Sequence, residues 1–323
     1  MRARAMRSTG SRALAGIILC CLASGCSTAQ SGPATSAHPT GRATPAPSLV
    51  AGVTSIPVGL TSNDIVLPTD AYSLTVAQQG EWVLAANTLA RRCLVKFGFQ
   101  VPAPPGPVNR GLDAYGNQRR YGVPPSLAYA RDYGFHFSEN DPRSPQMVNE
   151  SAWPPAMSAD EAEVLHGTNA SGAVTSYAGM SVPSRGCMGQ ADTEVSSSSI
   201  VPTAVSDLDI ESYEQSQADP RVITAQAQWS KCMAAQGYSY KTSLEAFGNP
   251  PEGSGQVASS AEIAVAVADY TCATQVNLIG IWFAVETAYQ RQQIDVNAQV
   301  FAQALLYTQA EQKTIASVLS GNQ

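Results

Sequence analysis

The chain has 323 residues, of which 44% are hydrophobic and 14% charged, with 19 basic side chains against 25 acidic ones. This length and apolar content suffice for one large or two modest domains with packed cores. The acidic balance and the scattered arginines and lysines argue against a nucleic-acid-binding protein, which needs clustered basic residues.

The first 25 residues have the composition of an export signal. Arginines between residues 2 and 12 form a basic region, and an apolar run over residues 13–23 follows it. The run is too short to span a bilayer as a stable helix. The string Leu22-Ala23-Ser24-Gly25-Cys26 resembles the lipobox of bacterial lipoproteins, in which the equivalent cysteine is diacylated and becomes the mature N-terminus. The alternative is an ordinary secretory signal with a coincidental cysteine.

The lipobox resemblance implies that Cys26 carries acyl chains such as palmitate, which anchor the protein to the extracytoplasmic face of the bacterial cell membrane. Two chains give stable attachment where one is marginal. Loss of residues 1–25 removes four arginines and no acids, which leaves 15 basic and 25 acidic residues and a formal charge near −10. We therefore expect the acyl chains, rather than surface charge, to hold the protein at the membrane.

Residues 26–62 are rich in Ser, Thr, Ala, Pro and Gly and show no helical or strand periodicity. Such a stretch cannot bury enough apolar surface to offset its ordering entropy, so we predict a lipid anchor followed by a disordered linker. The remainder is predicted to form two helical disulfide units. The first spans 63–198 and contains long loops, and the second spans 199–323 and ends in long helices.

Four cysteines remain once the signal and the anchor are set aside: Cys93, Cys187, Cys232 and Cys272. Outside the cytoplasm an even number of cysteines indicates disulfides, and four cysteines allow three connectivities. Cys93 and Cys232 each begin the pattern Cys-x4-Gly-aromatic, and each precedes a cysteine that lacks this pattern. We therefore favour one bridge within each unit, Cys93 to Cys187 and Cys232 to Cys272.

Helix signals recur along the chain and predict a mainly α, disulfide-stapled domain. Apolar residues at helical spacing lead from Leu74 through Cys93 to a stop at Gly98. Short helices are predicted from 126 to 133 and from 158 to 167. Asp219 and Pro220 begin a further helix that Gly237 ends.

The C-terminal third carries the strongest helical pattern. A capping box, Ser259-x-x-Glu262, precedes a stretch to Leu319 that has no proline and a single glycine, Gly280. This pattern predicts one very long helix or a tight helical hairpin. Its Gln, Asn and Glu residues exclude a transmembrane segment.

Residues 99–157 are rich in Pro, Gly, Tyr and Arg, and we predict long ordered loops there. The candidate binding residues of this region alternate aromatic rings with guanidinium groups: Tyr121, Tyr129, Tyr133, Arg119 and Arg120. Such a set could line a groove that stacks on sugar rings or captures a peptide. The alternative is that the rings pack the loop onto neighbouring helices.

Signals for catalysis are few. The chain has no CxxC pair, no Gly-x-Ser-x-Gly elbow and no HExxH string, and His136 and His166 are the only histidines beyond the linker. We therefore expect no metal and no cofactor. The acids Asp207, Asp209, Glu211 and Glu214 could act as paired carboxylates on a glycan, but acids in the first turns of a solvated helix are the simpler interpretation.

Several motifs together resemble an uncharacterised actinobacterial lipoprotein family: Trp229-Ser230-Lys231-Cys232-Met233 with Gly237-Tyr238, Ala266-Val267-Ala268-Asp269-Tyr270-Thr271-Cys272, and Arg120-Tyr121-Gly122. The resemblance covers most of residues 64–305 and departs at Leu94, where methionine is common. It implies location and disulfides but no chemistry. We expect a membrane-tethered module that binds a ligand, or a protein or glycan partner of the envelope, with a glycan or peptide hydrolase as the alternative.

Overall fold

The computed structural model describes residues 49–107, 117–138, 141, 153–154, 156–196, 203–252 and 255–321. All of them belong to one compact unit, Pro45–Gln323. The predicted signal peptide, Cys26 and the linker up to residue 48 lie outside the described residues. So do parts of the predicted Pro/Gly/Tyr-rich loops, at 108–116, 139–140, 142–152 and 155.

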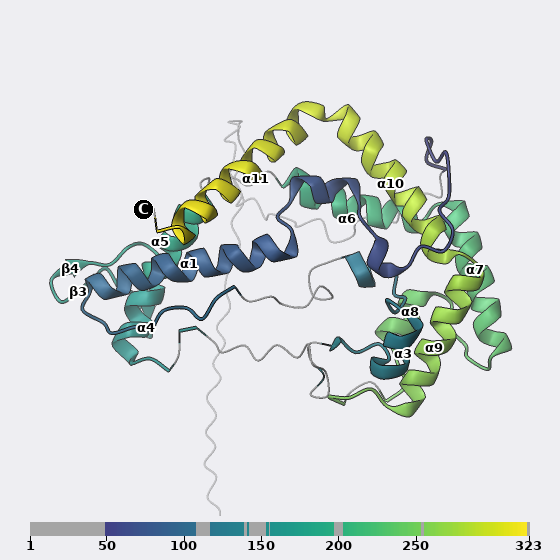
Figure 1. Ribbon diagram of the computed structural model, residues 1–323, viewed down its shortest axis with the longest axis horizontal. Coiled ribbons are helices and arrows are strands. Elements are labelled where there is room, and N and C mark those ends of the chain that lie inside the picture. The colour runs from purple at the N-terminus through teal and green to yellow at the C-terminus, as the bar shows by residue number, and fades with distance from the viewer. Residues whose placement is uncertain are drawn as a thin grey trace, which may run out of the picture. The chain divides into compact units, whose positions relative to one another are not determined.

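The described residues are mainly helical, which confirms the predicted fold class (Figure 1). The helices run in the order η1 (Ser62–Asp64), η2 (Pro68–Tyr72), α1 (Val76–Lys96), η3 (Asn117–Arg119), α3 (Leu127–Tyr133), α4 (Ala159–His166), α5 (Gly186–Val195), α6 (Ala204–Gln217), α7 (Pro220–Ala235), α8 (Ser243–Gly248), α9 (Ser260–Gln275), α10 (Leu278–Val296) and α11 (Ala298–Leu319). Two short antiparallel hairpins lie between α4 and α5. They are β1 (Thr168–Asn169) with β2 (Gly172–Ala173), and β3 (Ser176–Tyr177) with β4 (Met180–Ser181).

The helix boundaries follow the predicted capping residues. Ser158 and Ser259 accept hydrogen bonds from backbone N–H groups three residues on, and Asp219 accepts one from Arg221. These contacts satisfy N–H groups that have no partner inside the helix. Gly98 and Gly167 adopt positive φ angles of 90° and 67° just after their helices, which ends the helices there.

The predicted single helix or hairpin at the C-terminus is wrong, because three helices, α9, α10 and α11, fill this stretch. Asn277 has a left-handed backbone, with φ 54° and ψ 40°, and separates α9 from α10. Asparagine tolerates this conformation better than most residues. Gly280 lies inside α10, where a Cβ atom would overlap the carbonyl oxygen of Pro57. No described helix is both long and apolar enough to cross a membrane.

Two apolar cores organise the described residues. One lies among α1, α4 and α5 and includes Ile315 and Val318 from the end of α11. The other lies among α3, α7, α9 and α10 and includes Tyr121 and Val123 from the segment after η3. Helices α3 and α9 lie side by side in this second core (Figure 1). Each core thus draws residues from both sides of the predicted boundary at 198.

Each core contains one disulfide, and the predicted pairing is confirmed. Cys93 in the last turns of α1 joins Cys187 in the first turn of α5, with a Cα–Cα distance of 5.6 Å. Cys232 of α7 joins Cys272 of α9 across the same Cα–Cα distance, 5.6 Å. The two bridges therefore tie the ends of α1 and α7 to neighbouring helices.

Residues 49–62 are folded, so the predicted linker extends too far toward the C-terminus. The backbone N–H of Val50 donates to Oδ2 of Asp219 at 3.1 Å, and Arg221 donates to the carbonyl oxygen of Val50 at 3.0 Å. Further on, Asn277 donates to the carbonyl oxygen of Pro57 at 2.9 Å. Burial disfavours charge on Asp219, but the hydrogen bonds from Arg221 and Val50 outweigh this and lower its pKa. These contacts hold the segment against the starts of α7 and α10.

Candidate functional site

The predicted aromatic groove is not assembled, because its arginines and Tyr121 point inward. Arg119 is only 8% exposed. Its guanidinium group lies over the ring of Tyr129 and donates to the carbonyl oxygens of Phe135 and His136 at 3.1 and 2.7 Å. The rings of Tyr129 and Tyr133 pack together with centroids 5.0 Å apart. These residues hold the loop onto α3, as expected if the rings pack the loop onto helices rather than line a groove.

Tyr121 is part of the core. It is 1% exposed, and its ring stacks on Trp282 at a centroid distance of 4.8 Å. Its hydroxyl donates to Oε2 of Glu286 at 2.9 Å. Burial and the neighbouring carboxylate raise the pKa of Tyr121 well above its ordinary value. The phenol therefore stays protonated and serves as a fixed donor.

Arg120 joins two carboxylates from different helices. Its Nε atom donates to Oε1 of Glu286 in α10 at 2.8 Å, and Nη1 donates to Oδ2 of Asp209 in α6 at 3.1 Å. Glu286 is fully buried, and Asp209 is 36% exposed. Burial raises the pKa of Glu286, whereas Arg120 and Tyr121 oppose the shift. Since a charged donor and a phenol both donate to it, Glu286 is best described as a carboxylate paired with Arg120.

This buried network continues to η2. Gln290 of α10 donates to the hydroxyl of Ser212 at 3.0 Å, and its Oε1 atom accepts from the backbone and hydroxyl of Thr69 at 3.0 and 3.1 Å. The hydroxyl of Thr69 also lies 3.4 Å from Oδ1 of Asp209. The network therefore fixes Thr69 and Asp209 relative to each other. A rigid, hydrogen-bonded support of this kind is typical of a preformed ligand site.

A pocket of about 660 Å³ lies beside Thr69 and Asp209. Its walls come from η2, the start of α1, η3, α6 and α11, and we call it the η2–α11 pocket. Its polar lining includes three carboxyl groups and four amides, together with several hydroxyl groups such as that of Thr308. The carboxyl groups and amides are those of Asp70, Asp209, Glu311, Asn63, Gln79, Asn117 and Gln118. Tyr72 and Tyr307 add aromatic surface, and Phe301 supports Tyr72 with ring centroids 5.0 Å apart. None of the described residues that line the pocket is Arg, Lys or His.

The pocket's acids sit in different environments. Asp70 accepts hydrogen bonds from the N–H of Leu67 at 2.8 Å and from Asn117 at 2.9 Å, yet burial raises its pKa. Burial likewise raises the pKa of Glu311, against hydrogen bonds from Trp82 and Ser196. Asp209 is ion-paired with Arg120. The buried Oε1 atom of Gln118 has no hydrogen-bond partner among the described residues.

Sequence reasoning missed most of this pocket. Of the lining residues, the sequence singled out Asp209, which belongs to the acidic run of α6. It did not single out Asp70, Gln118, Tyr307 or Glu311. These four residues lie on segments up to 241 positions apart, and none belongs to a local motif. Asp207, by contrast, occupies the first turn of α6, and Asp160 and Glu161 that of α4, as the helix-dipole interpretation predicts.

His136 makes a structural contact rather than a catalytic one. Its Nδ1 atom lies 2.8 Å from Oε1 of Glu262, and its Nε2 atom lies 2.8 Å from the carbonyl oxygen of Gly255. Both partners are acceptors, so the ring donates from both nitrogens and is protonated. Burial lowers the pKa of His136, but the hydrogen bonds to Gly255 and Glu262 outweigh this and raise it. Both ring nitrogens of His136 are therefore occupied by these two contacts.

The other predicted histidine, His166, is exposed in the last turn of α4. Within the described ranges, no three His, Cys, Asp or Glu side chains lie close enough together to hold a metal ion. No protein-family model, curated protein or solved structure matches the chain. Arguments about its function therefore depend on its own residues.

Proposed function

We propose that the protein is a lipid-anchored binding protein of the bacterial envelope, which takes a polar ligand without negative charge, a glycan fragment, in the η2–α11 pocket. The observation that carries this proposal is the composition of the pocket. It combines acceptors and amides with two tyrosine rings and has no basic side chain among its described lining residues.

The lining favours hydroxyl-bearing ligands for a physical reason. Carboxylates accept hydrogen bonds from hydroxyl groups, and the amides of Asn117 and Gln118 can both donate and accept. Tyr72 and Tyr307 offer flat apolar faces of the kind that cover the apolar face of a sugar ring. Asp70, Asp209 and Glu311 disfavour an anionic ligand, although Arg120 is ion-paired with Asp209 and also interacts with Asp70.

The buried network supports binding by limiting how far the pocket must reorganise. Gln290 holds Thr69 and Arg120 holds Asp209, while Arg120 is itself paired with buried Glu286. The hydroxyl of Thr69 also lies 3.4 Å from Oδ1 of Asp209. Side chains that are already ordered lose little entropy when a ligand arrives. The pocket can therefore bind a ligand without rearranging the side chains that line it.

The location of this activity follows from the N-terminal residues. The lipobox resemblance supports lipidation of Cys26 by two acyl chains, and the predicted linker after it would give the folded unit reach from the membrane. Two disulfides are typical of an oxidising, extracytoplasmic compartment. The motif resemblance to the actinobacterial lipoprotein family supports the same location.

Calorimetric titration of the full-length protein in detergent with neutral N-acetylglucosamine oligosaccharides tests the proposal. We expect saturable binding, and Tyr307→Ala and Gln118→Ala should each weaken it by about tenfold, which corresponds to roughly 1.4 kcal/mol. Tyr133→Ala is the matched control, because it removes a tyrosine of the originally predicted groove that does not line the pocket. Absence of binding, or loss in Tyr133→Ala with Tyr307→Ala unaffected, contradicts the proposal.

A second candidate, a glycan hydrolase, is favoured by one observation. Asp70 and Asp209 line the same pocket, and burial raises the pKa of Asp70 while Arg120 pairs with Asp209. Carboxyl groups in such different environments can divide the roles of general acid and base. Hydrolysis of the same oligosaccharides that falls at least a hundredfold in Asp70→Asn supports this candidate. Binding without any hydrolysis by the unmodified protein excludes it for these substrates.

A further inference from the structure

The two disulfides differ in how far solvent can reach them. Cys93 and Cys187 are 8% and 0% exposed inside their core. Cys272 is also fully buried, but Cys232 is only partly buried, at the surface of α7. Attack by an external thiolate requires access to one sulfur atom. Of these four cysteines, Cys232 is the most exposed.

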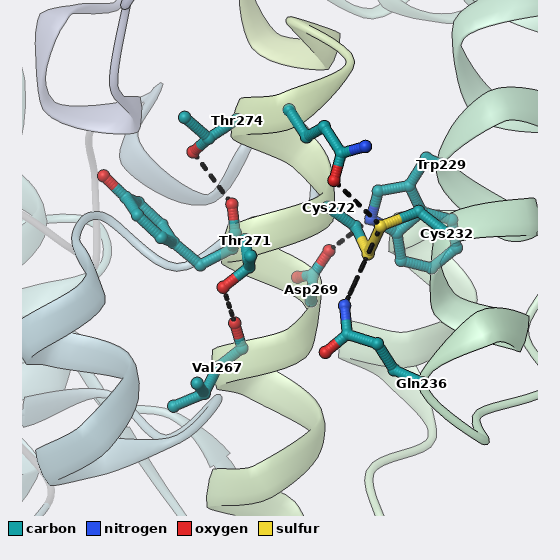
Figure 2. The surroundings of a disulfide bond; sticks show 10 residues. Trp229, Cys232, Gln236, Val267, Asp269, Thr271, Cys272 and Thr274 are labelled. Carbon is teal, nitrogen blue, oxygen red and sulfur yellow. Dashed lines mark hydrogen bonds between the residues drawn. A yellow bond between two sulfur atoms is a disulfide. The ribbon is translucent and has the colours of Figure 1, made fainter.

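Hydrogen bonding makes the two sulfur atoms of this bridge unequal. The side-chain amide of Gln236 donates to Sγ of Cys272 at 2.9 Å and lies 3.8 Å from Sγ of Cys232 (Figure 2). On the other side, Oε1 of Gln275 lies 3.7 Å from Sγ of Cys232. An N–H donor stabilises negative charge on Cys272, the buried sulfur.

Asp269 lies one helical turn before Cys272 on α9, and both side chains face α7 (Figure 2). Its carboxyl group is fully buried. Oδ1 accepts a hydrogen bond from Nε1 of Trp229 at 2.8 Å, and Oδ2 has no hydrogen-bond partner among the described residues. Burial raises the pKa of Asp269 well above its ordinary value. The raised pKa favours the protonated, uncharged form of this group, which lies one helical turn from Cys272.

We propose that the Cys232–Cys272 bridge is a site of thiol–disulfide exchange with an extracytoplasmic dithiol, which attacks Sγ of Cys232. Cys232, the most exposed of the four described cysteines, is the point of attack, and buried Cys272 is the leaving group. Gln236 and Asp269 act as positioning and proton-donating residues for that leaving group. Cys93–Cys187 remains a structural bridge, because its core excludes the attacking thiolate.

The exchange balances in two steps. A thiolate of the dithiol forms a bond to Sγ of Cys232, the bond between the two protein sulfurs breaks, and its electron pair leaves on Sγ of Cys272. Asp269 transfers its proton to that sulfur and is reprotonated from solvent. The second thiol of the reductant, as its thiolate, then attacks the mixed disulfide. Cys232 is released and takes a proton from water, and the reductant is left oxidised by two electrons.

Differential alkylation of the lipidated full-length protein in detergent tests this proposal. The protein is exposed to limiting dithiothreitol at neutral pH, quenched with acid and mapped by mass spectrometry. We expect Cys232 and Cys272 to become reduced at least tenfold faster than Cys93 and Cys187. With the monothiol 2-mercaptoethanol as probe, the first mixed disulfide should form on Cys232.

Variants of the flanking residues separate the proposed roles from simple exposure. Gln236→Ala and Asp269→Asn should each slow reduction of this bridge about threefold to tenfold. Gln275→Ala is the matched control, since it removes the same side chain from beside the attacked sulfur, and its rate should stay within twofold. Thermal unfolding of each variant, measured in parallel, identifies rate changes that arise from destabilisation.

Three results would overturn the proposal. They are equal reduction rates for the two bridges, a first adduct on Cys272, and unchanged rates in both Gln236→Ala and Asp269→Asn. Asp269→Asn can alter folding, because its partner Trp229 is buried. Gln236 is exposed, so its variant decides the question of the leaving group if Asp269→Asn is unstable.

Discussion

Arg120 and Glu286 form an ion pair, with Nε donating to Oε1 at 2.8 Å, between residues 166 positions apart in the chain. Glu286 is fully buried, and the side chain of Arg120 is 12% exposed. This contact turns Arg120 away from the groove that its neighbours Arg119 and Tyr121 were predicted to line. It also positions Asp209 at the wall of the η2–α11 pocket.

The first prediction concerns this ion pair. Arg120→Met leaves the Glu286 carboxylate buried without its cation, and we expect a loss of about 3–5 kcal/mol in the free energy of unfolding. Chemical denaturation measures it. Arg131→Met, at an exposed arginine of α3, is the control and should change stability by less than about 0.5 kcal/mol. Equal, small losses in both variants would show that the pair contributes nothing.

A second prediction follows from the raised pKa of His136. The pKa of His136 in the folded protein lies above the ordinary value of 6.5. Its contribution to the free energy of unfolding is therefore fully present below pH 6.5. The contribution disappears as the pH rises through the folded-state pKa, because deprotonation removes one of its two donors. The difference in unfolding free energy between the protein and His136→Gln should therefore be largest near pH 5 and shrink at alkaline pH. Urea denaturation across this range measures the difference.

His166→Gln is the control for this pH series, because His166 is exposed at the end of α4. Its unfolding free energy should follow that of the unmodified protein at every pH. A His136→Gln difference that grows above neutral pH has the wrong sign for this argument and contradicts the protonated, doubly donating ring.

The third prediction tests how residues 49–62 are held. Gly280→Ala places a Cβ atom against the carbonyl oxygen of Pro57, which must move. We expect faster hydrogen exchange and earlier proteolysis in residues 49–60, together with a loss of unfolding free energy. Gly248→Ala is the matched control: this helical glycine has nothing within 4 Å of a Cβ atom, so the change should be neutral or stabilising. Unaltered exchange in Gly280→Ala would mean that the segment is not packed there.

The region around Asn277 and Gly280 shows which helix boundaries could be predicted from the sequence and which could not. Helix starts at Ser158, Asp219 and Ser259 and the stop at Gly98 were predictable, because their caps lie within a few residues. The break at Asn277 was not. Its side chain donates to the carbonyl oxygen of Pro57, a residue 220 positions away. Gly280 lies inside α10 and marks a close approach of a distant chain segment.

The candidate site likewise combines features that could be predicted from the sequence with features that could not. The disulfide pairing was predictable from a repeated local pattern around Cys93 and Cys232. The pocket was not, since Asp70, Gln118 and Glu311 meet only after η2, η3 and α11 have packed together. Arg120 and Tyr121 have the residue types of a surface binding site, and only the buried position of Glu286 explains why they face inward.

The last prediction concerns the anchor, which lies outside the described residues. Cys26→Ala removes the atom that would carry the acyl chains, so the protein should move from the membrane fraction to the soluble extracytoplasmic fraction. Incorporation of labelled palmitate should fall to background in the same variant. Cys21→Ala, inside the apolar signal region, is the control and should leave both properties unchanged. Two buried acyl chains bind far more tightly than one, so loss of the whole attachment site should release most of the protein. A Cys26→Ala protein that stays with the membrane would refute the lipid anchor and leave an ordinary export signal, or a partner in the envelope, to explain its location.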